Sequence, residues 1–252
     1  MSNDLLAAGL AAWFIAAVIA LTGQAAFAAR ILIGIGGLAF LALVLTTLPG
    51  GSQSVHTPLG LGDMSGSVFQ LSPDALWLLG FGLPGAIFAA WLGTPTRRQT
   101  SRVFGVAASL IGAIGVFGLQ DAVSFLVAWE IMSLGGAVMI LREDLAPEIG
   151  RPVLFMLGLL EAGSVALILA FILLAQATGS LAFSDFAATA RAMPEGEQLF
   201  IGLLLLVGFG AKLGLLPFYE WFPGAYGACS GATGALLSGV ILMRPFSRSV
   251  AD

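Results

Sequence analysis

Eight mostly apolar segments divide this sequence, and each approaches the length of a helix that crosses a lipid bilayer. Such a helix needs about 20 predominantly apolar residues, because its backbone polar groups must pair with one another inside the hydrocarbon. The chain is 58% hydrophobic and 10% charged, which is typical of a polytopic membrane protein. We therefore predict an all-α, polytopic transmembrane helix bundle of about eight spans. The segments are 4–22, 31–48, 74–93, 102–120, 121–141, 152–175, 198–217 and 228–243.

The connections between these segments are short, with two exceptions. Gln120 and Asp121 form the only polar break between the fourth and fifth segments, so we expect a tight turn there. The loop Pro49–Ser72 is rich in Gly, Ser and Pro and is expected to form a short hairpin or an irregular cap. The loop Gln176–Gln198 contains Phe183–Phe186 and is expected to hold a short surface helix.

The basic residues predict the orientation, because cytoplasmic loops carry an excess of Lys and Arg. We predict a multi-pass protein of the inner (cytoplasmic) membrane with its N-terminus outside. Ala26-Phe27-Ala28 resembles a signal-peptidase site, but the acidic Asp4 and the lack of a basic leading region favour a first membrane span. In this orientation the cytoplasmic arginines are Arg30, Arg97, Arg98, Arg102, Arg142 and Arg151, and the remaining ones are Arg191, Arg244 and Arg248.

Several classes of function are not expected. The basic residues are few and scattered, so nucleic-acid binding is not predicted. The single Cys229 excludes an internal disulfide, and we interpret it as a packing residue, with His56 solvated in its polar loop. Paired His ligands for haem and a cysteine set for an iron–sulfur cluster are missing from the sequence. We therefore expect no cofactor and no metal, and no electron transfer by this chain itself.

Three ionisable residues lie inside the predicted spans: Glu130, Glu161 and Lys212. A charged side chain near the middle of a spanning helix costs about 3 kcal/mol or more, so it usually has a partner and a function. Asp121 and Glu220 lie instead at span ends, where we expect solvated side chains.

Lys212 lies in a segment that is expected to be a broken helix. Gly210, Gly214 and Pro217 surround it, and proline removes a backbone donor from the helical ladder. A broken helix at membrane depth is tolerated only beside protein or a water-filled cavity, and such helices mark ion sites in transporters. The seventh segment therefore offers a lysine at a polar, hydratable position.

Glu130 and Lys212 together are candidates for a proton gate. Burial disfavours the charged form of a lysine, and a nearby carboxylate favours it, so separating or neutralising the carboxylate releases the lysine proton. The alternative is a structural ion pair between Glu130 and Lys212 that locks two helices together. Glu161 is expected to modulate the gate or to extend the proton path.

Two segments resemble a known family. Asp121–Leu134, which contains Trp129 followed by Glu130, is similar to the fifth helix of the antiporter-like subunits of complex I, of membrane-bound nickel–iron hydrogenases and of multi-subunit sodium/proton antiporters. Gly208–Pro217, followed by Trp221-Phe-Pro223 and Ala235–Val240, looks like the broken seventh helix and the start of the eighth helix of the same family. Within that family, the hydrogenase-4 or formate hydrogenlyase type is the most similar.

The resemblance implies a proton-translocating module of a membrane arm, with Glu130 as the channel glutamate and Lys212 as the channel lysine. It also implies other membrane subunits as partners and an outside N-terminus. This chain departs from the family pattern at Gly224 and Tyr226, where relatives commonly carry Glu and His, and at Ala232, where a histidine is expected. These departures remove relay groups toward the bundle centre.

The resemblance also predicts the organisation of the chain. Relatives have about fourteen helices built as two inverted repeats, and this chain matches the first three helices and one five-helix repeat. We expect a single transmembrane domain over 1–252, with peripheral helices in 1–93, the channel repeat in 102–243 and an atypical tail in 244–252.

The leading functional hypothesis is a proton-translocating subunit, or half of one, in a hydrogenase-4-like or complex-I-like oxidoreductase. A non-conducting scaffold subunit of such a complex is the first alternative. The other is a subunit of a cation/proton antiporter or of an inorganic-carbon uptake system.

Overall fold

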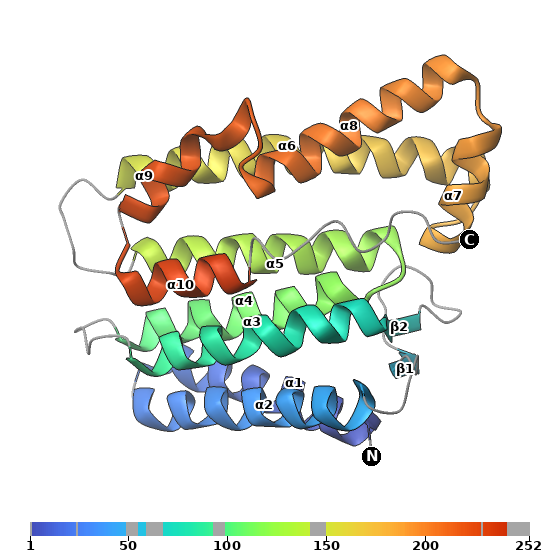
Figure 1. Ribbon diagram of the computed structural model, residues 1–252. Coiled ribbons are helices and arrows are strands. Elements are labelled where there is room, and N and C mark those ends of the chain that lie inside the picture. The colour runs from blue at the N-terminus through green and yellow to red at the C-terminus, as the bar shows by residue number, and fades with distance from the viewer. Residues whose placement is uncertain are drawn as a thin grey trace.

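The structure is a computed structural model that describes residues 2–23, 25–48, 55–58, 68–92, 99–141, 150–227 and 229–240. Most of these residues lie in helices that run along one common axis (Figure 1). Within the described residues, five helices are long and apolar enough to cross a membrane, and two further apolar stretches, Pro73–Phe88 and Arg102–Gly118, are shorter. The chain is therefore an all-α membrane helix bundle, as predicted.

The helices form four layers, which are stacked from bottom to top in Figure 1. Each of the eight apolar segments of the sequence overlaps one of the helices α1 to α6, α8 and α10, and the last segment is described only as far as Val240. In order, the layers are α1 (Ser2–Leu21) with α2 (Ala26–Thr47), α3 (Pro73–Leu92) with α4 (Gln99–Gly118), α5 (Ala122–Leu141) with α10 (Gly231–Val240), and α6 (Gly150–Thr178) with α8 (Glu195–Leu213) and α9 (Trp221–Gly227).

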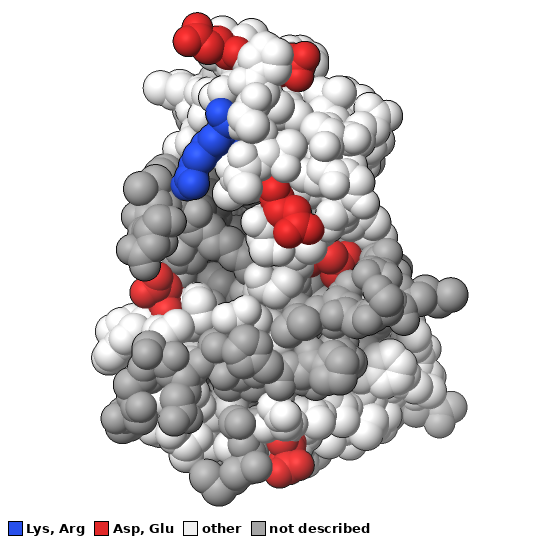
Figure 2. All heavy atoms as spheres, turned by 90° about the vertical axis from the view of Figure 1, so that its right-hand side faces the viewer, with Lys and Arg blue, Asp and Glu red and all other residues white. Residues whose placement is uncertain are grey.

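The two longer loops contain the elements expected of them, and both lie at the same end of the bundle (Figure 1). Strands β1 (Val55–Pro58) and β2 (Val68–Leu71) form an antiparallel hairpin. The short helix α7 (Phe183–Ala192) buries Phe186 against the bundle. Viewed from this end, the few charged side chains stand on a largely uncharged surface (Figure 2).

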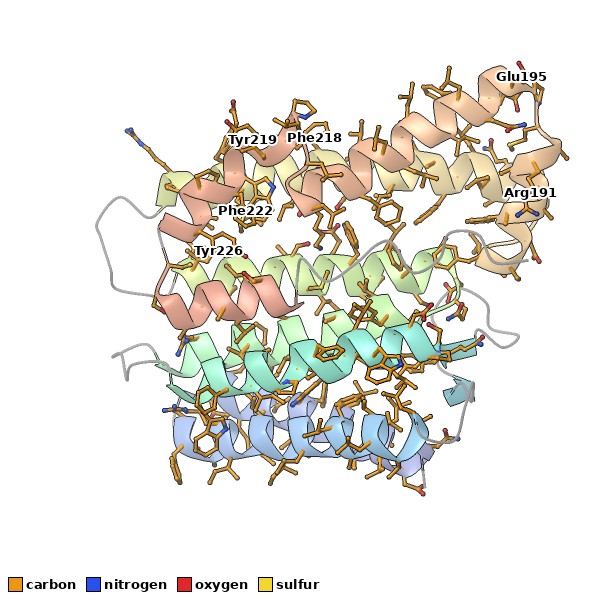
Figure 3. All side chains as sticks on the ribbon, in the orientation of Figure 1. Arg191, Glu195, Phe218, Tyr219, Phe222 and Tyr226 are labelled. Carbon is orange, nitrogen blue, oxygen red and sulfur yellow. The ribbon has the colours of Figure 1, made fainter. Side chains whose placement is uncertain are left out.

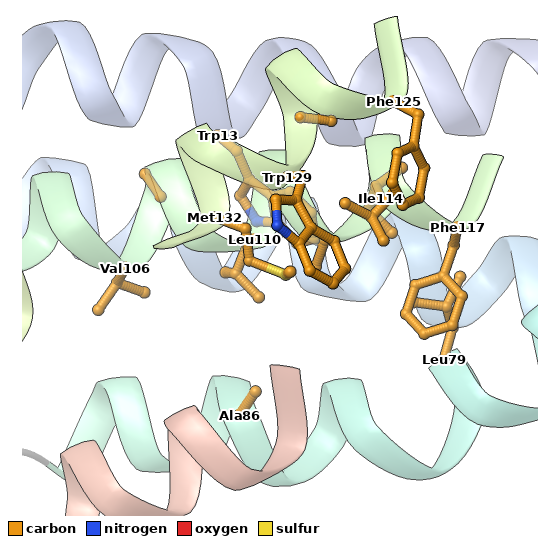
Figure 4. Packing of buried hydrophobic residues seen from close by; sticks show 14 of the residues in the cluster. Trp13, Leu79, Ala86, Val106, Leu110, Ile114, Phe117, Phe125, Trp129 and Met132 are labelled. Atoms are coloured by element: carbon orange, nitrogen blue, oxygen red, sulfur yellow. The ribbon is translucent and has the colours of Figure 1, made fainter. Parts of the chain in front are cut away.

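Helices α4 and α5 approach each other closely at glycine positions. A Cβ atom on Gly112 would lie 2.7 Å from the carbonyl oxygen of Ala128, and one on Gly135 would lie 2.7 Å from the backbone nitrogen of Ser109. Small residues at such contacts allow helix backbones to pack in lipid without a hydrophobic driving force. Around this contact Trp13, Leu110, Ile114 and other apolar side chains fill the centre of the bundle (Figure 4).

Asp121 corrects one expectation, because it is buried rather than solvated. Its side chain is 3% exposed, and its Oδ1 atom accepts a hydrogen bond of 2.8 Å from the backbone N–H of Ser124. It therefore caps the N-terminus of α5, where an acidic side chain satisfies a free donor and complements the helix dipole. The chain that follows α6 covers it, since Asp121 forms a β-bridge with Ala182. Glu220 is exposed, as expected.

Candidate functional site

Helix α5 contributes three side chains to the candidate site. Its apolar sequence forms a regular helix that starts at the Asp121 cap, and Trp129 and Ser133 follow on one face because they are four residues apart. Both are buried, whereas Glu130 is partly buried. Sequence reasoning identified Glu130 but missed Ser133 and the carbonyl group of Trp129. The i, i+4 spacing of Trp129 and Ser133 is the signal that could have indicated a shared face.

Helix α8 contributes Lys212 in its last turn, directly before the break. The helix ends at Leu213, and Gly214 adopts a left-handed conformation with a φ of +64°. The N–H of Leu215 donates to the carbonyl of Gly210 at 2.9 Å, and the indole N–H of Trp221 donates to the carbonyl of Ala211 at 2.8 Å. The carbonyl groups that the break frees are thus paired again within the protein.

The break extends over Gly214–Pro217, and the chain then continues in a 3₁₀ turn over Phe218–Glu220 and in α9. Gly210 remains inside α8, where its carbonyl accepts the hydrogen bond from the N–H of Leu215 in the break. Figure 3 labels the aromatic side chains that follow the break, among them Phe222 and Tyr226. Their rings stack with centroids 4.1 Å apart, and the Tyr226 hydroxyl lies 2.9 Å from Ser238 Oγ of α10.

Helices α6 and α8 are in close contact next to Lys212. A Cβ atom on Gly163 of α6 would lie 2.7 Å from the Cβ atom of Ala211 and 3.1 Å from the carbonyl oxygen of Gly208. This close approach brings Glu161, two residues before Gly163, to the same level of the bundle as Lys212. The site is therefore built where three helices, α5, α6 and α8, meet.

Lys212 is 2% exposed, and within the described part of the chain its hydrogen bonds go to groups of α5. Its Nζ atom donates a hydrogen bond of 2.9 Å to the carbonyl oxygen of Trp129 and a second hydrogen bond to Ser133 Oγ. The same atom lies 4.0 Å from the centroid of the Trp129 indole, which is a cation–π distance. A buried ammonium of this kind is stabilised by its acceptors and by the negative face of the ring.

The two carboxylates interact with Lys212 without a direct hydrogen bond from it. Lys212 experiences the charges of Glu130 and of Glu161, and the carboxyl groups of Glu130 and Glu161 are within hydrogen-bonding reach of each other. The Oε1 atom of Glu130 is buried and receives no donor from the described residues. An ionised Glu161 carboxylate is also only an acceptor. A hydrogen bond between Glu130 and Glu161 therefore requires that one of the two carboxyl groups carry a proton.

The structure therefore brings Glu130, Glu161 and Lys212 together, and among the described residues it shows no direct ion pair between Glu130 and Lys212, which was the structural alternative to a proton gate. Within the described part of the chain, the hydrogen bonds of Lys212 go to neutral acceptors and not to a carboxylate. Gly224 and Tyr226 lie on α9 and Ala232 on α10, so neither helix supplies a glutamate or a histidine at these positions. The local chemistry is a buried amine beside two carboxyl groups.

An aromatic cluster separates this site from the end of the bundle that carries α7. Phe125 and Phe209 pack against the Trp129 ring with centroid distances of 5.5 and 5.6 Å. Phe171, Phe183 and Phe186 extend the cluster to the surface helix. Aromatic rings therefore lie between Lys212 and that end of the bundle.

The described residues offer little to a metal ion. No group of three or more His, Cys, Asp or Glu side chains is gathered anywhere within them. Cys229 is partly buried, and His56 lies in β1. The tail 244–252 lies outside the described residues.

Comparison with known proteins points to membrane complexes. Residues 120–244 match the family model described as NADH:quinone oxidoreductase/Mrp antiporter, TM. The chain is 31% identical over 129 residues to Hydrogenase-4 component B of Escherichia coli, covering 51% of this chain and 19% of that protein. It is 29% identical over 188 residues to NADH-quinone oxidoreductase subunit N of Deinococcus radiodurans, covering 71% of this chain and 38% of that protein.

Solved structures of two membrane complexes contain a similar fold. A chain of the membrane-bound sulfane sulfur reductase, an archaeal respiratory membrane complex, matches with a TM-score of 0.75 and 25% identity, covering 94% of this chain and 39% of that chain. A chain of the Mrp complex from Dietzia sp. matches with a TM-score of 0.73 and 19% identity, covering 96% and 27%. The chain thus spans less than two fifths of the length of each of these four proteins.

Proposed function

We propose that this chain, which belongs to the antiporter-like family of membrane subunits, forms part of a proton pathway in a multi-subunit membrane complex. The observation that carries the proposal is the environment of Lys212. The ammonium is buried in an apolar bundle at a helix break, beside two carboxyl groups of neighbouring helices. Intramembrane groups of this kind are costly and are usually retained for ion or proton movement.

The chemistry of the pathway follows from the two kinds of group. A buried lysine exchanges its proton when the balance between desolvation and neighbouring negative charge changes. Glu130 is the first candidate acceptor, since it lies on the same helix as the residues that hold Lys212. Glu161 adds a second negative charge on α6 and shares hydrogen-bonding reach with Glu130. Proton movement between these groups needs no metal and no redox centre.

The proposed orientation places the N-terminus outside and the complex in the inner membrane. The N-terminal ends of α2, α4 and α6 lie at one end of the bundle, and these ends carry Arg30, Arg102 and Arg151 (Figure 1). Arg191 of α7 lies at the other end, near Glu195 (Figure 3). This asymmetry supports a cytoplasmic location for the arginine-bearing end.

Membrane vesicles containing the assembled complex provide the test. Glu130→Gln and Lys212→Ala are each expected to abolish coupled proton uptake, while the amount of chain in the membrane stays near the normal level. Glu195→Gln is the matched control, because it makes the same chemical change at an exposed position. Unchanged proton uptake in either site variant would contradict the proposal.

A scaffold subunit that conducts nothing is the second candidate. Two observations favour it: Lys212 donates to protein acceptors, and relay groups are missing at Gly224, Tyr226 and Ala232. For a scaffold, the same two variants would lower the amount of assembled complex and would leave proton uptake per complex unchanged. The vesicle experiment therefore separates the two candidates.

A further inference from the structure

The hydroxyl group of Ser133 is the only side-chain hydrogen-bond partner of Lys212 among the described residues, and sequence reasoning assigned no role to it. Lys212 Nζ donates to Ser133 Oγ, and Ser133 Oγ in turn donates to the carbonyl oxygen of Trp129 at 2.9 Å. The Trp129 carbonyl also accepts directly from Lys212 at 2.9 Å. The three groups form a closed triangle on one turn of α5, which we call the α5 cradle: Lys212 Nζ, Ser133 Oγ and Trp129 O.

The hydroxyl in this cradle has one proton and two lone pairs. In the arrangement described above, its proton goes to the Trp129 carbonyl and one lone pair accepts from Lys212. This is the arrangement that a charged ammonium requires, because an ammonium has three donors and no acceptor. The Trp129 carbonyl is shared by these two side-chain donors and by the helical N–H of Ser133.

When Lys212 loses its proton, its Nζ atom gains a lone pair and requires a hydrogen-bond donor in place of an acceptor. An Nζ–H bond breaks, the proton passes toward the Glu130 carboxylate to form a carboxylic acid, and Nζ keeps the electron pair. A buried amine whose lone pair receives no donor carries a desolvation penalty. Ser133 is already in contact with Nζ and can supply the donor by turning its O–H from the Trp129 carbonyl to Nζ. The Trp129 carbonyl keeps an N–H of the amine as its donor.

We propose that Ser133 is a positioning residue that remains hydrogen-bonded to Lys212 in both protonation states by reversing the direction of its own hydrogen bond. The proposal rests on the proposed function, since it describes how the lysine of that pathway gives up a proton while buried. The charged groups that face Lys212 from the described elements around it are Glu130 on α5 and Glu161 on α6.

The sequence makes this proposal directly measurable, because Lys212 is the only lysine in the chain. Labelling with lysine that carries ¹⁵N at Nζ therefore gives one side-chain signal per chain in solid-state NMR spectra. Only this chain carries the label, and it is reconstituted in lipid bilayers together with unlabelled partner subunits. The pH is then varied until both the ammonium and the amine resonances of Lys212 are seen. In Ser133→Ala both resonances are expected to shift.

Three further variants test whether the shifts come from loss of the Ser133 hydroxyl group. Ser133→Thr retains a hydroxyl and is expected to restore both resonance positions. Ser109→Ala is the matched control, because Ser109 is a buried serine that donates to the Met132 carbonyl at 3.3 Å and not to the α5 cradle. It is expected to leave both resonances in place. If Ser133→Ala does not fold, Ser133→Cys provides a side chain of similar size with a much weaker donor.

The outcomes separate this inference from the proposed function. If Ser133→Ala or Ser133→Cys moves only the ammonium resonance, or neither resonance, the reversal does not occur and the inference is overturned. Proton uptake by Ser133→Ala vesicles is expected to fall about tenfold, as for the loss of one hydrogen bond to a charged group, with recovery in Ser133→Thr. Shifted resonances in a chain that transports no protons would uphold the inference and reject the proposed function.

Discussion

Lys212 Nζ lies 2.9 Å from the main-chain carbonyl oxygen of Trp129 and 4.0 Å from the centroid of the same residue's indole ring. One residue of α5 therefore contacts the buried charge of α8 in two ways. The backbone contact survives any substitution of the side chain, so the two contributions can be measured separately.

Replacement of the Trp129 ring tests the second contact. A desolvated cation–π interaction contributes about 2 kcal/mol, and Phe offers a weaker ring than Trp. We expect Trp129→Phe to keep most of the proton uptake and Trp129→Leu to lose substantially more, as measured by initial rates in vesicles. Equal rates in the two variants would show that the ring acts only as apolar packing.

Lys212→Arg separates charge from proton exchange. Arginine retains the positive charge, but it is not deprotonated in proteins. Proton uptake is therefore expected to fall to the level of Lys212→Ala, although the chain still inserts and assembles. Appreciable uptake by Lys212→Arg would mean that the site needs a fixed charge and not an exchangeable proton.

Glu161→Gln tests the second carboxylate. Removing this charge leaves Glu130 as the one carboxylate that interacts with Lys212 among the described residues. We expect proton uptake to decrease less than in Glu130→Gln, because Glu161 is exposed on α6 and Glu130 Oε1 is buried. Complete loss of uptake in Glu161→Gln, with normal assembly, would make Glu161 an obligatory member of the pathway.

Asp121→Ala is expected to destabilise the bundle by about 1 kcal/mol through loss of the α5 cap. Asp121→Asn keeps an oxygen that can accept from the N–H of Ser124 and should lose much less. Thermal unfolding in detergent measures both. If the two variants unfold at the same temperature, the carboxylate charge matters and not the cap.

Gly112→Ala is expected to lower the stability of the α4–α5 contact by about 1–3 kcal/mol, as for an overpacked core. The added Cβ atom would lie 2.5 Å from the backbone nitrogen of Met132 and 2.7 Å from the carbonyl oxygen of Ala128, which are backbone atoms that cannot move aside easily. Gly158→Ala is the control, because a Cβ atom there meets nothing within 4 Å. The unfolding temperatures of the two variants test this prediction, and equal temperatures would contradict it.

Much of the fold follows from the sequence, since length and hydrophobicity alone determine which segments form helices in lipid. The tight turn at Gln120, the hairpin before α3 and the surface helix α7 were expected from turn residues and polarity. The burial of Asp121 was not, because it depends on Ala182, which is sixty-one residues away in the chain and forms a β-bridge with it.

The site was only partly predictable for the same reason. Glu130, Glu161 and Lys212 stand out because charges inside apolar segments are rare. Their assignment to a proton pathway stays a prediction. Ser133 does not stand out, since a serine in a membrane helix usually bonds to its own backbone. Its contact with Lys212 depends on which face of α5 is turned toward the end of α8, and the sequence of α5 alone does not determine this tertiary arrangement.

The glycine contacts between α4 and α5 have a mechanical consequence. Backbones that interlock at Gly112 and Gly135 leave α5 almost no freedom to shift without dragging its neighbour along. The chain around Gly214, by contrast, has left the helical ladder. Lys212 lies on the α8 side of this break, where Ala211 and Gly208 pack against Gly163 of α6, so a swing of the chain beyond Gly214 can displace α9 while the amine keeps its acceptors.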